Sequence, residues 1–145
     1  MIPRALSGSM SIAAQIVPDD LPYIVDLGFR SILSNRPDGE AEDQPDTDDL
    51  RRLAFDHGLV FAHLPVIAGA IDDTDVLAFE QTLGDLPTPI LAFCRTGHRS
   101  AILWSLVMAR EMEVEDIIAT ALDAECDISA FRPYLEAYAR GEERL

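Results

Sequence analysis

The segment TPILAFC, residues 88–94, is the feature that most constrains the fold, because it is apolar almost throughout. A strand with one face in water alternates polar and apolar residues, whereas a strand covered on both faces does not. Coverage of both faces requires helices on each side of the sheet, which is the arrangement of parallel α/β proteins. The segment therefore predicts a buried parallel strand in an α/β fold.

The rest of the chain alternates between strand patterns and helix patterns, and then ends in helices alone. Expected strands cover residues 9–16, 29–34 and 59–66. Expected helices cover residues 18–28, 50–58 (capped by Asp46 or Thr47), 72–85, 101–112, 114–125 and 129–140. This order predicts a single α/β domain over residues 1–145, with a mainly parallel sheet of four to five strands flanked by helices.

Composition excludes several classes of function. The net charge is −15, so no basic face is available for nucleic acid or for an anionic membrane. All eleven basic residues are arginine, which excludes every lysine-based phosphate loop or Schiff base. The two cysteines and three histidines show no metal-ligand spacing, so no metal and no cofactor is expected. Without a signal peptide or a long apolar run, a cytoplasmic location is expected.

The loop CRTGHRS, residues 94–100, joins the apolar strand to the next helix and holds the candidate catalytic residues. Backbone N–H groups in such a loop converge, and the helix N-terminus adds partial positive charge. Cysteines in such settings have pKa values that fall from ~8.5 to roughly 3.5–7.5. Cys94 is therefore the candidate nucleophile and Arg99 its catalytic partner. The candidate anion-binding residues of the loop are Arg95, Thr96, Gly97, His98 and Ser100.

Together with SNRPDGE, residues 34–40, this loop resembles the phosphatase-like domain of beta-lactamase-hydrolase-like proteins, which are also described as sulfur transferases. The resemblance covers roughly residues 9–112. It implies a fold like that of dual-specificity phosphatases. It also adds Asn35 and Arg36 as candidate anion-binding residues, with Asp38 and Glu40 as candidates to hold Arg36.

Two departures from the phosphatase pattern lead to an expectation of sulfur transfer. Four residues separate Cys94 from Arg99, as in rhodaneses, whereas the related phosphatases have five. The general acid of those phosphatases has only Asp72, Asp73 and Asp75 as candidates, and these look like residues that begin a helix. We therefore expect a rhodanese-like sulfurtransferase, with a persulfide on Cys94.

The expected sulfur donor is a small anion such as thiosulfate or glutathione persulfide, and the acceptor is a thiol or sulfite. Sulfide detoxification would be the setting, and a separate persulfide-oxidising enzyme is left open as a partner. The alternative is a cysteine-dependent phosphatase that acts on phosphotyrosine or small phosphoesters through a phosphocysteine. A non-catalytic oxyanion, sulfide or redox sensor remains as a third interpretation.

Overall fold

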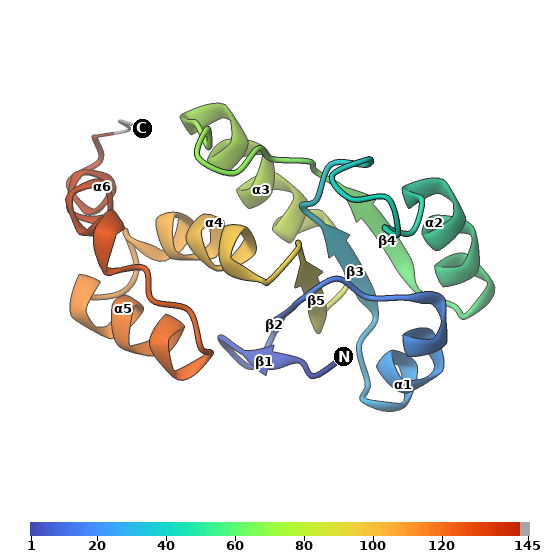
Figure 1. Ribbon diagram of the computed structural model, residues 1–145. Helices are drawn as coiled ribbons and strands as arrows, with labels where there is room; N and C mark the ends of the chain where they lie inside the picture. The colour runs from blue at the N-terminus through green and yellow to red at the C-terminus, as the bar shows by residue number, and fades with distance from the viewer. Residues whose placement is uncertain (143–145) are drawn as a thin grey trace.

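The computed structural model describes residues 1–142, and its strands form one sheet in the order β1-β2-β5-β3-β4 (Figure 1). β1 pairs with β2 in the antiparallel sense, and all the other neighbours are parallel. The predicted α/β class with a mostly parallel sheet is therefore confirmed. The strands are β1 (Arg4–Ala5), β2 (Met10–Ala13), β3 (Ser31–Ser34), β4 (Val60–His63) and β5 (Ile90–Phe93).

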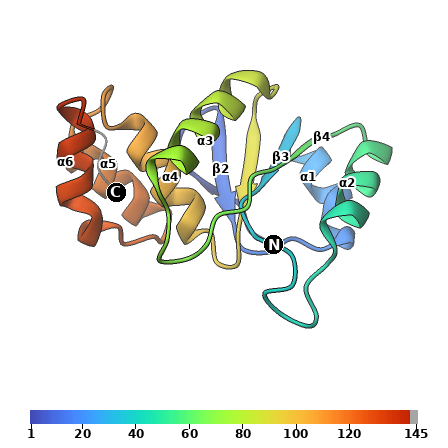
Figure 2. The same cartoon turned by 90° about the horizontal axis from the view of Figure 1, so that it is seen from above.

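Helices cover both faces of this sheet (Figure 2). On one face lie α1 (Leu21–Asp26) and α2 (Thr47–Asp56). The other face is covered by α3 (Asp73–Asp85) and α4 (His98–Met108), and α5 (Val114–Asp123) and α6 (Arg132–Ala139) pack against α4. None of the helices in the described part of the chain is long and apolar enough to cross a membrane.

β5 lies in the middle of the sheet and separates two hydrophobic cores, which explains the apolar run at residues 88–94. Ile90 and Ala92 pack in the core under α3 and α4, whereas Leu91 and Phe93 pack in the core under α1 and α2. Full burial of one such large side chain contributes about 1.5–3 kcal/mol. Each face of the strand is thus stabilised by its own layer of helices.

Several element boundaries differ from the sequence prediction. The short strand β1 was missed, because two residues carry no periodic pattern. The expected helix at 18–28 divides into a 3₁₀ turn, η1 (Pro18–Asp20), and α1, and the one at 129–140 into η2 (Ser129–Phe131) and α6. The helix that was expected to begin at residue 101 begins at His98, so part of the cysteine motif is helical.

The register of the parallel strands brings their carboxyl ends together. Phe93, the last residue of β5, pairs with Ala13 of β2 and with Ser34 of β3, and Ser34 pairs in turn with His63 of β4. The loops that follow these four strands therefore leave the sheet at the same edge. Ligands of open α/β sheets bind outside this edge.

Candidate active site

Cys94 follows β5 directly and lies buried at the bottom of the loop that leads into α4. The Gly97 N–H donates a hydrogen bond to the Cys94 Sγ at 3.1 Å. Gly97 adopts the left-handed conformation at φ 96°, and a Cβ atom there would collide with the Arg4 guanidinium. Glycine at this position is therefore required both for the turn and for the close approach of Arg4.

Arg4 holds the cysteine loop from outside, a role that the sequence analysis did not predict. Its Nη2 donates to the Thr96 carbonyl oxygen at 2.6 Å, and its Nη1 donates to the Ala124 carbonyl oxygen at 2.9 Å. An arginine in a two-residue strand belongs to no motif, so only the folded chain places it against the loop. The N-terminal hairpin thereby ties the cysteine loop to the end of α5.

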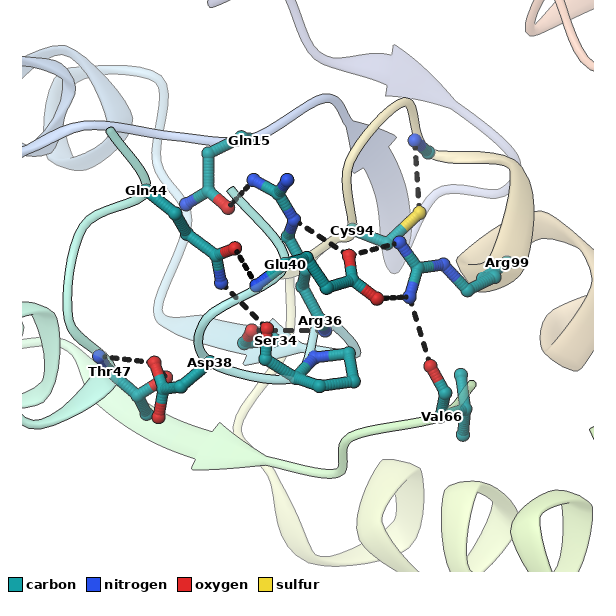
Figure 3. Close-up of polar contacts among 12 residues, drawn as sticks. Gln15, Ser34, Arg36, Asp38, Glu40, Gln44, Thr47, Val66, Cys94 and Arg99 are labelled. Atoms are coloured by element: carbon teal, nitrogen blue, oxygen red, sulfur yellow. Dashed lines mark hydrogen bonds and ion pairs between the residues drawn. The ribbon is translucent and has the colours of Figure 1, made fainter. Parts of the chain in front are cut away.

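Arg99 is buried and is held by a carboxylate from the loop after β3 (Figure 3). Its Nη1 and Nη2 donate to the two carboxylate oxygens of Glu40 at 2.8 and 2.9 Å. The Nη1 also donates to the Val66 carbonyl oxygen at 3.0 Å. Such a two-pronged pair fixes the plane as well as the position of a guanidinium. Sequence reasoning assigned Glu40 only to Arg36 and missed this contact.

The charges of this pair are mutually stabilised. The hydrogen bond from Arg99, followed by that from Arg36, lowers the pKa of Glu40 to about 2. The hydrogen bond to Glu40 in turn raises the pKa of Arg99, and the neighbouring Cys94 adds a smaller contribution in the same direction. Glu40 is therefore ionised at neutral pH, so it orients Arg99 and holds no proton to donate.

The contacts to Glu40 and Val66 leave one edge of the Arg99 guanidinium for a ligand. They use both N–H groups of Nη1 and one of Nη2, so the Nε–H and the other Nη2–H remain on the adjacent edge. The Cys94 side chain lies next to this guanidinium (Figure 3). The remaining edge and the sulfur are thus brought to the same point, where an oxyanion with several oxygens can accept both N–H groups.

Arg36 is directed to Glu40 and to the loop after β2. Its Nε donates to Glu40 Oε1 at 2.9 Å, and its Nη1 donates to Gln15 Oε1 at 2.9 Å. Asp38, the other expected partner of Arg36, instead accepts hydrogen bonds from the backbone N–H and the hydroxyl of Thr47. Glu40 therefore joins the two buried arginines, Arg36 and Arg99.

Asn35 and Ser100 lie together beneath the site and are both fully buried. The Ser100 hydroxyl donates to Asn35 Oδ1 at 2.8 Å, and Asn35 Nδ2 donates to the Leu64 carbonyl oxygen at 3.0 Å. The single hydroxyl proton of Ser100, one of the candidate anion-binding residues, is thus directed to Asn35. These bonds join the ends of β3 and β4 to the first turn of α4.

The other loop residues take different positions. Arg95 is exposed and lines a hollow on the Arg4 side of the loop. The Thr96 hydroxyl accepts a hydrogen bond from the His98 N–H at 3.3 Å. His98 and Arg99 line a separate cavity on the side of α6. The loop thus has two sides, and only one of them carries Arg99.

The three aspartates weighed as general acids belong to the N-terminus of α3. Asp72 is its N-cap, and Asp72 and Asp75 exchange hydrogen bonds between side chain and backbone N–H at 3.1 and 2.9 Å. Asp73 accepts a hydrogen bond from the Tyr138 hydroxyl. All three carboxylates are committed to helix capping or to α6, and none of their described contacts reaches Cys94 or Arg99.

Cys126 is buried in the core under α4, and its burial raises the pKa of its thiol. Its sulfur lies 3.9 Å from Arg4 Nη1. These surroundings disfavour a thiolate at Cys126.

Residues 3–111 match the sequence model of the phosphatase-like domain of beta-lactamase hydrolase-like proteins, and the chain belongs to this family. A beta-lactamase hydrolase-like protein of Agrobacterium fabrum C58 is 31% identical over 106 residues, which cover 73% of this chain and 25% of that protein. One from Xylella fastidiosa 9a5c is 29% identical over 132 residues, covering 90% and 31%. The chain thus spans about a quarter to a third of these relatives.

Several solved structures described as phosphatases share the fold. A candidate phosphatase of Neisseria meningitidis Z2491 is 36% identical, with a TM-score of 0.85 over 93% of this chain and 96% of that one. A candidate phosphatase of Shewanella putrefaciens CN-32 has a TM-score of 0.78 at 14% identity, with coverage of 98% and 93%. The catalytic core of a PP-IP phosphatase of S. cerevisiae has a TM-score of 0.71 at 15% identity, with coverage of 95% and 88%.

These comparisons contradict the expected sulfurtransferase activity, because the family and the structural relatives are phosphatase-like. The persulfide on Cys94, the sulfur donors and the role in sulfide detoxification lose their support with it. The short spacing between Cys94 and Arg99 does not by itself exclude phosphate. Because α4 begins at His98, within the motif, the unpaired N–H groups of its first turn add to the donors of the short loop.

Proposed function

We propose that the protein is a cysteine-dependent phosphatase that hydrolyses phosphomonoesters through a phosphocysteine at Cys94. The observation that carries this proposal is the fixed orientation of Arg99. Glu40 holds one edge of the guanidinium at 2.8 and 2.9 Å, and Cys94 lies next to the same side chain (Figure 3). A guanidinium edge held beforehand stabilises the charge on a transferring phosphoryl group without having to reorganise.

In the first step of the proposed reaction, the non-bridging phosphate oxygens accept the loop N–H groups and the Nε–H and Nη2–H of Arg99. The Cys94 thiolate attacks phosphorus, so that an S–P bond forms and the bond from phosphorus to the ester oxygen breaks. The ester oxygen leaves with the electron pair and takes a proton from water. Glu40 cannot supply that proton, because its pKa is lowered to about 2.

In the second step, water attacks the phosphorus of the phosphocysteine and the S–P bond breaks. The products are hydrogen phosphate and the Cys94 thiolate. The proton that water loses balances the proton taken up by the leaving oxygen, so the overall reaction consumes one water and no other reactant. Arg99 and the loop N–H groups bind the same three phosphate oxygens in both steps, so one arrangement serves both.

The test is the initial rate of p-nitrophenyl phosphate hydrolysis by the wild type, Cys94→Ser and Cys126→Ala. Loss of the nucleophile should lower kcat by at least about 10⁴-fold. Cys126→Ala is the matched control, because it removes the other thiol of the chain from a site in the core. Activity that survives in Cys94→Ser, or no activity in the wild type, would overturn the proposal.

A further inference from the structure

A cavity of about 430 Å³ opens beside the cysteine loop on the side of α6. Arg99 and His98 form its polar end. The rest of its wall comes from the loop after β4 (Ala68, Gly69 and Ile71), from α4 (Ile102) and from the C-terminal helices (Phe131 and Tyr134). The phosphate-binding arginine therefore stands at one end of a mainly apolar space.

The aromatic part of this wall is accessible to a ligand. The rings of Phe131 and Tyr134 lie 5.9 Å apart between centroids and are tilted by 51°. Tyr134 is 40% exposed, and Phe131 is half-buried against the core. Two tilted rings provide both an edge and a face for a third aromatic ring. Both residues lie beyond residues 3–111, the part of the chain that matches the family.

The lack of an acidic side chain among the described residues that line the cavity restricts which leaving groups can depart. Within residues 1–142, none of the cavity-lining residues is an aspartate or a glutamate. Asp72, Asp73 and Asp75 are engaged in α3, and Glu40 is ionised. Without a carboxylic acid to protonate it, the leaving oxygen departs as an anion. A phenol, with a pKa near 10, leaves in this way far more easily than an alkyl alcohol does.

The charge of the cavity disfavours substrates with several phosphates. Arg99 shares its charge with Glu40, and Arg95 lines a different hollow. With a net charge of −15 and no lysine, the chain has little cationic surface for further phosphate groups. The cavity therefore suits one phosphate attached to an uncharged group.

On the basis of the proposed phosphatase function, we infer that this cavity binds the aromatic group of an aryl phosphomonoester. The phosphate lies on the cysteine loop and on Arg99, and the ring packs against Phe131 and Tyr134. Transfer to Cys94 breaks the bond between phosphorus and the aryl oxygen, and the phenoxide released takes its proton from water. Phosphotyrosine in a protein and a small free aryl phosphate share this chemistry.

Two substrates separate the cavity from the catalytic loop. Phenyl phosphate needs a place for its ring, whereas acetyl phosphate has a small leaving group that needs neither the ring site nor an acid. Tyr134→Ala should raise KM for phenyl phosphate roughly tenfold and leave kcat/KM for acetyl phosphate within about twofold of the wild type. Tyr23→Ala is the matched control, because Tyr23 is similarly exposed, at 45%, on α1 across the sheet.

Phe131→Leu provides a second variant, which keeps an apolar side chain against the core while it removes the ring. We expect it to raise KM for phenyl phosphate and to keep the thermal unfolding midpoint close to that of the wild type. A phosphotyrosyl peptide compared with phenyl phosphate then distinguishes the two sources of the ligand, since the lower KM identifies the natural one.

Failure of the inference and failure of the proposed function give different results. If Tyr134→Ala and Phe131→Leu change both substrates equally, or change neither, the ring does not bind in this cavity, although the enzyme is a phosphatase. If the wild type hydrolyses neither phenyl phosphate nor acetyl phosphate, the phosphatase function itself is overturned, and the inference with it.

Discussion

Glu40 and Asp72 are both carboxylates in loops that leave the same edge of the sheet, Glu40 after β3 and Asp72 after β4. Glu40 turns inward and pairs with two buried arginines, Arg36 and Arg99. The Asp72 side chain instead accepts a hydrogen bond from the backbone of the helix that it precedes, and so caps α3. Position at the functional edge is therefore not enough to make a carboxylate part of the site. What distinguishes the two is whether a buried cation or a set of unpaired helix N–H groups lies within reach.

If the proposed function is correct, Glu40 positions the guanidinium of Arg99 for phosphate, whereas Asp72 does not. The largest effect is therefore expected from changing Arg99 itself. In Arg99→Lys the cation remains, but the planar edge that Glu40 holds is lost. We expect kcat/KM for p-nitrophenyl phosphate to fall by roughly 10³-fold. A fall of less than about tenfold would show that a point charge is sufficient and that the orientation set by Glu40 is unimportant.

Glu40→Gln tests the positioning role directly. Arg99 loses its charged two-pronged partner, and a misplacement of about 1 Å costs up to roughly a hundredfold in rate. We expect kcat/KM to fall by about that factor. We also expect inhibition by vanadate to weaken, because in the proposed site vanadate occupies the same edge of the Arg99 guanidinium as phosphate.

Glu42→Gln is the matched control for this substitution, because Glu42 lies in the same loop and is exposed. Glu40→Asp, which keeps the charge, should recover part of the vanadate affinity. If Glu40→Gln lowers the unfolding midpoint but leaves vanadate inhibition unchanged, Glu40 contributes only to stability.

Asp72→Ala should lower stability and leave activity nearly unchanged, in contrast to Glu40→Gln. Removing an N-cap aspartate costs about 1 kcal/mol of unfolding free energy, which urea titration measures. We expect kcat/KM to remain within about twofold of the wild type, because Asp72 contacts only the first turn of α3. A rate loss above about tenfold, with normal stability, would instead make this carboxylate the general acid.

The smallest expected effect is on the pH dependence of stability, through the contribution of Glu40 to the unfolding free energy. The pKa of Glu40 is lowered in the folded protein from 4.5 to about 2, so its contribution to stability is fully present above pH 4.5. That contribution is lost as the pH falls from 4.5 through about 2. The difference in unfolding free energy between wild type and Glu40→Gln should therefore be constant from pH 7 to about pH 5 and shrink below that. A difference that changes between pH 7 and pH 5 would contradict this assignment.

Much of the fold could be predicted from the sequence, because the apolar run at residues 88–94 and the alternation of elements are local patterns. The position of the cysteine loop at the carboxyl end of β5 followed from the same pattern. What could not be predicted were the contacts between distant segments. The Arg99–Glu40 pair joins residues that lie 59 positions apart, and Arg4 reaches Thr96 across 92 positions. Such pairings depend on strand order and register, which no local spacing reveals.

The incorrect expectation of sulfurtransferase activity also came from reading a local spacing without the folded structure. The spacing between Cys94 and Arg99 was interpreted as a shortened loop with too few donors for phosphate. In the folded chain His98, the residue before Arg99, begins α4, so the unpaired N–H groups of the first helical turn add to those of the loop. Counting residues between two motif positions therefore measures the loop only when the start of the helix is known.

The most direct test of the account is mass spectrometry of the enzyme after rapid acid quenching of p-nitrophenyl phosphate turnover. The account predicts a phosphoryl group on the peptide that contains Cys94, transient in the wild type and absent in Cys94→Ser. It also predicts a smaller phosphorylated fraction in Arg99→Lys. Turnover without any phosphoryl group on Cys94, or a phosphoryl group on another residue, would contradict it.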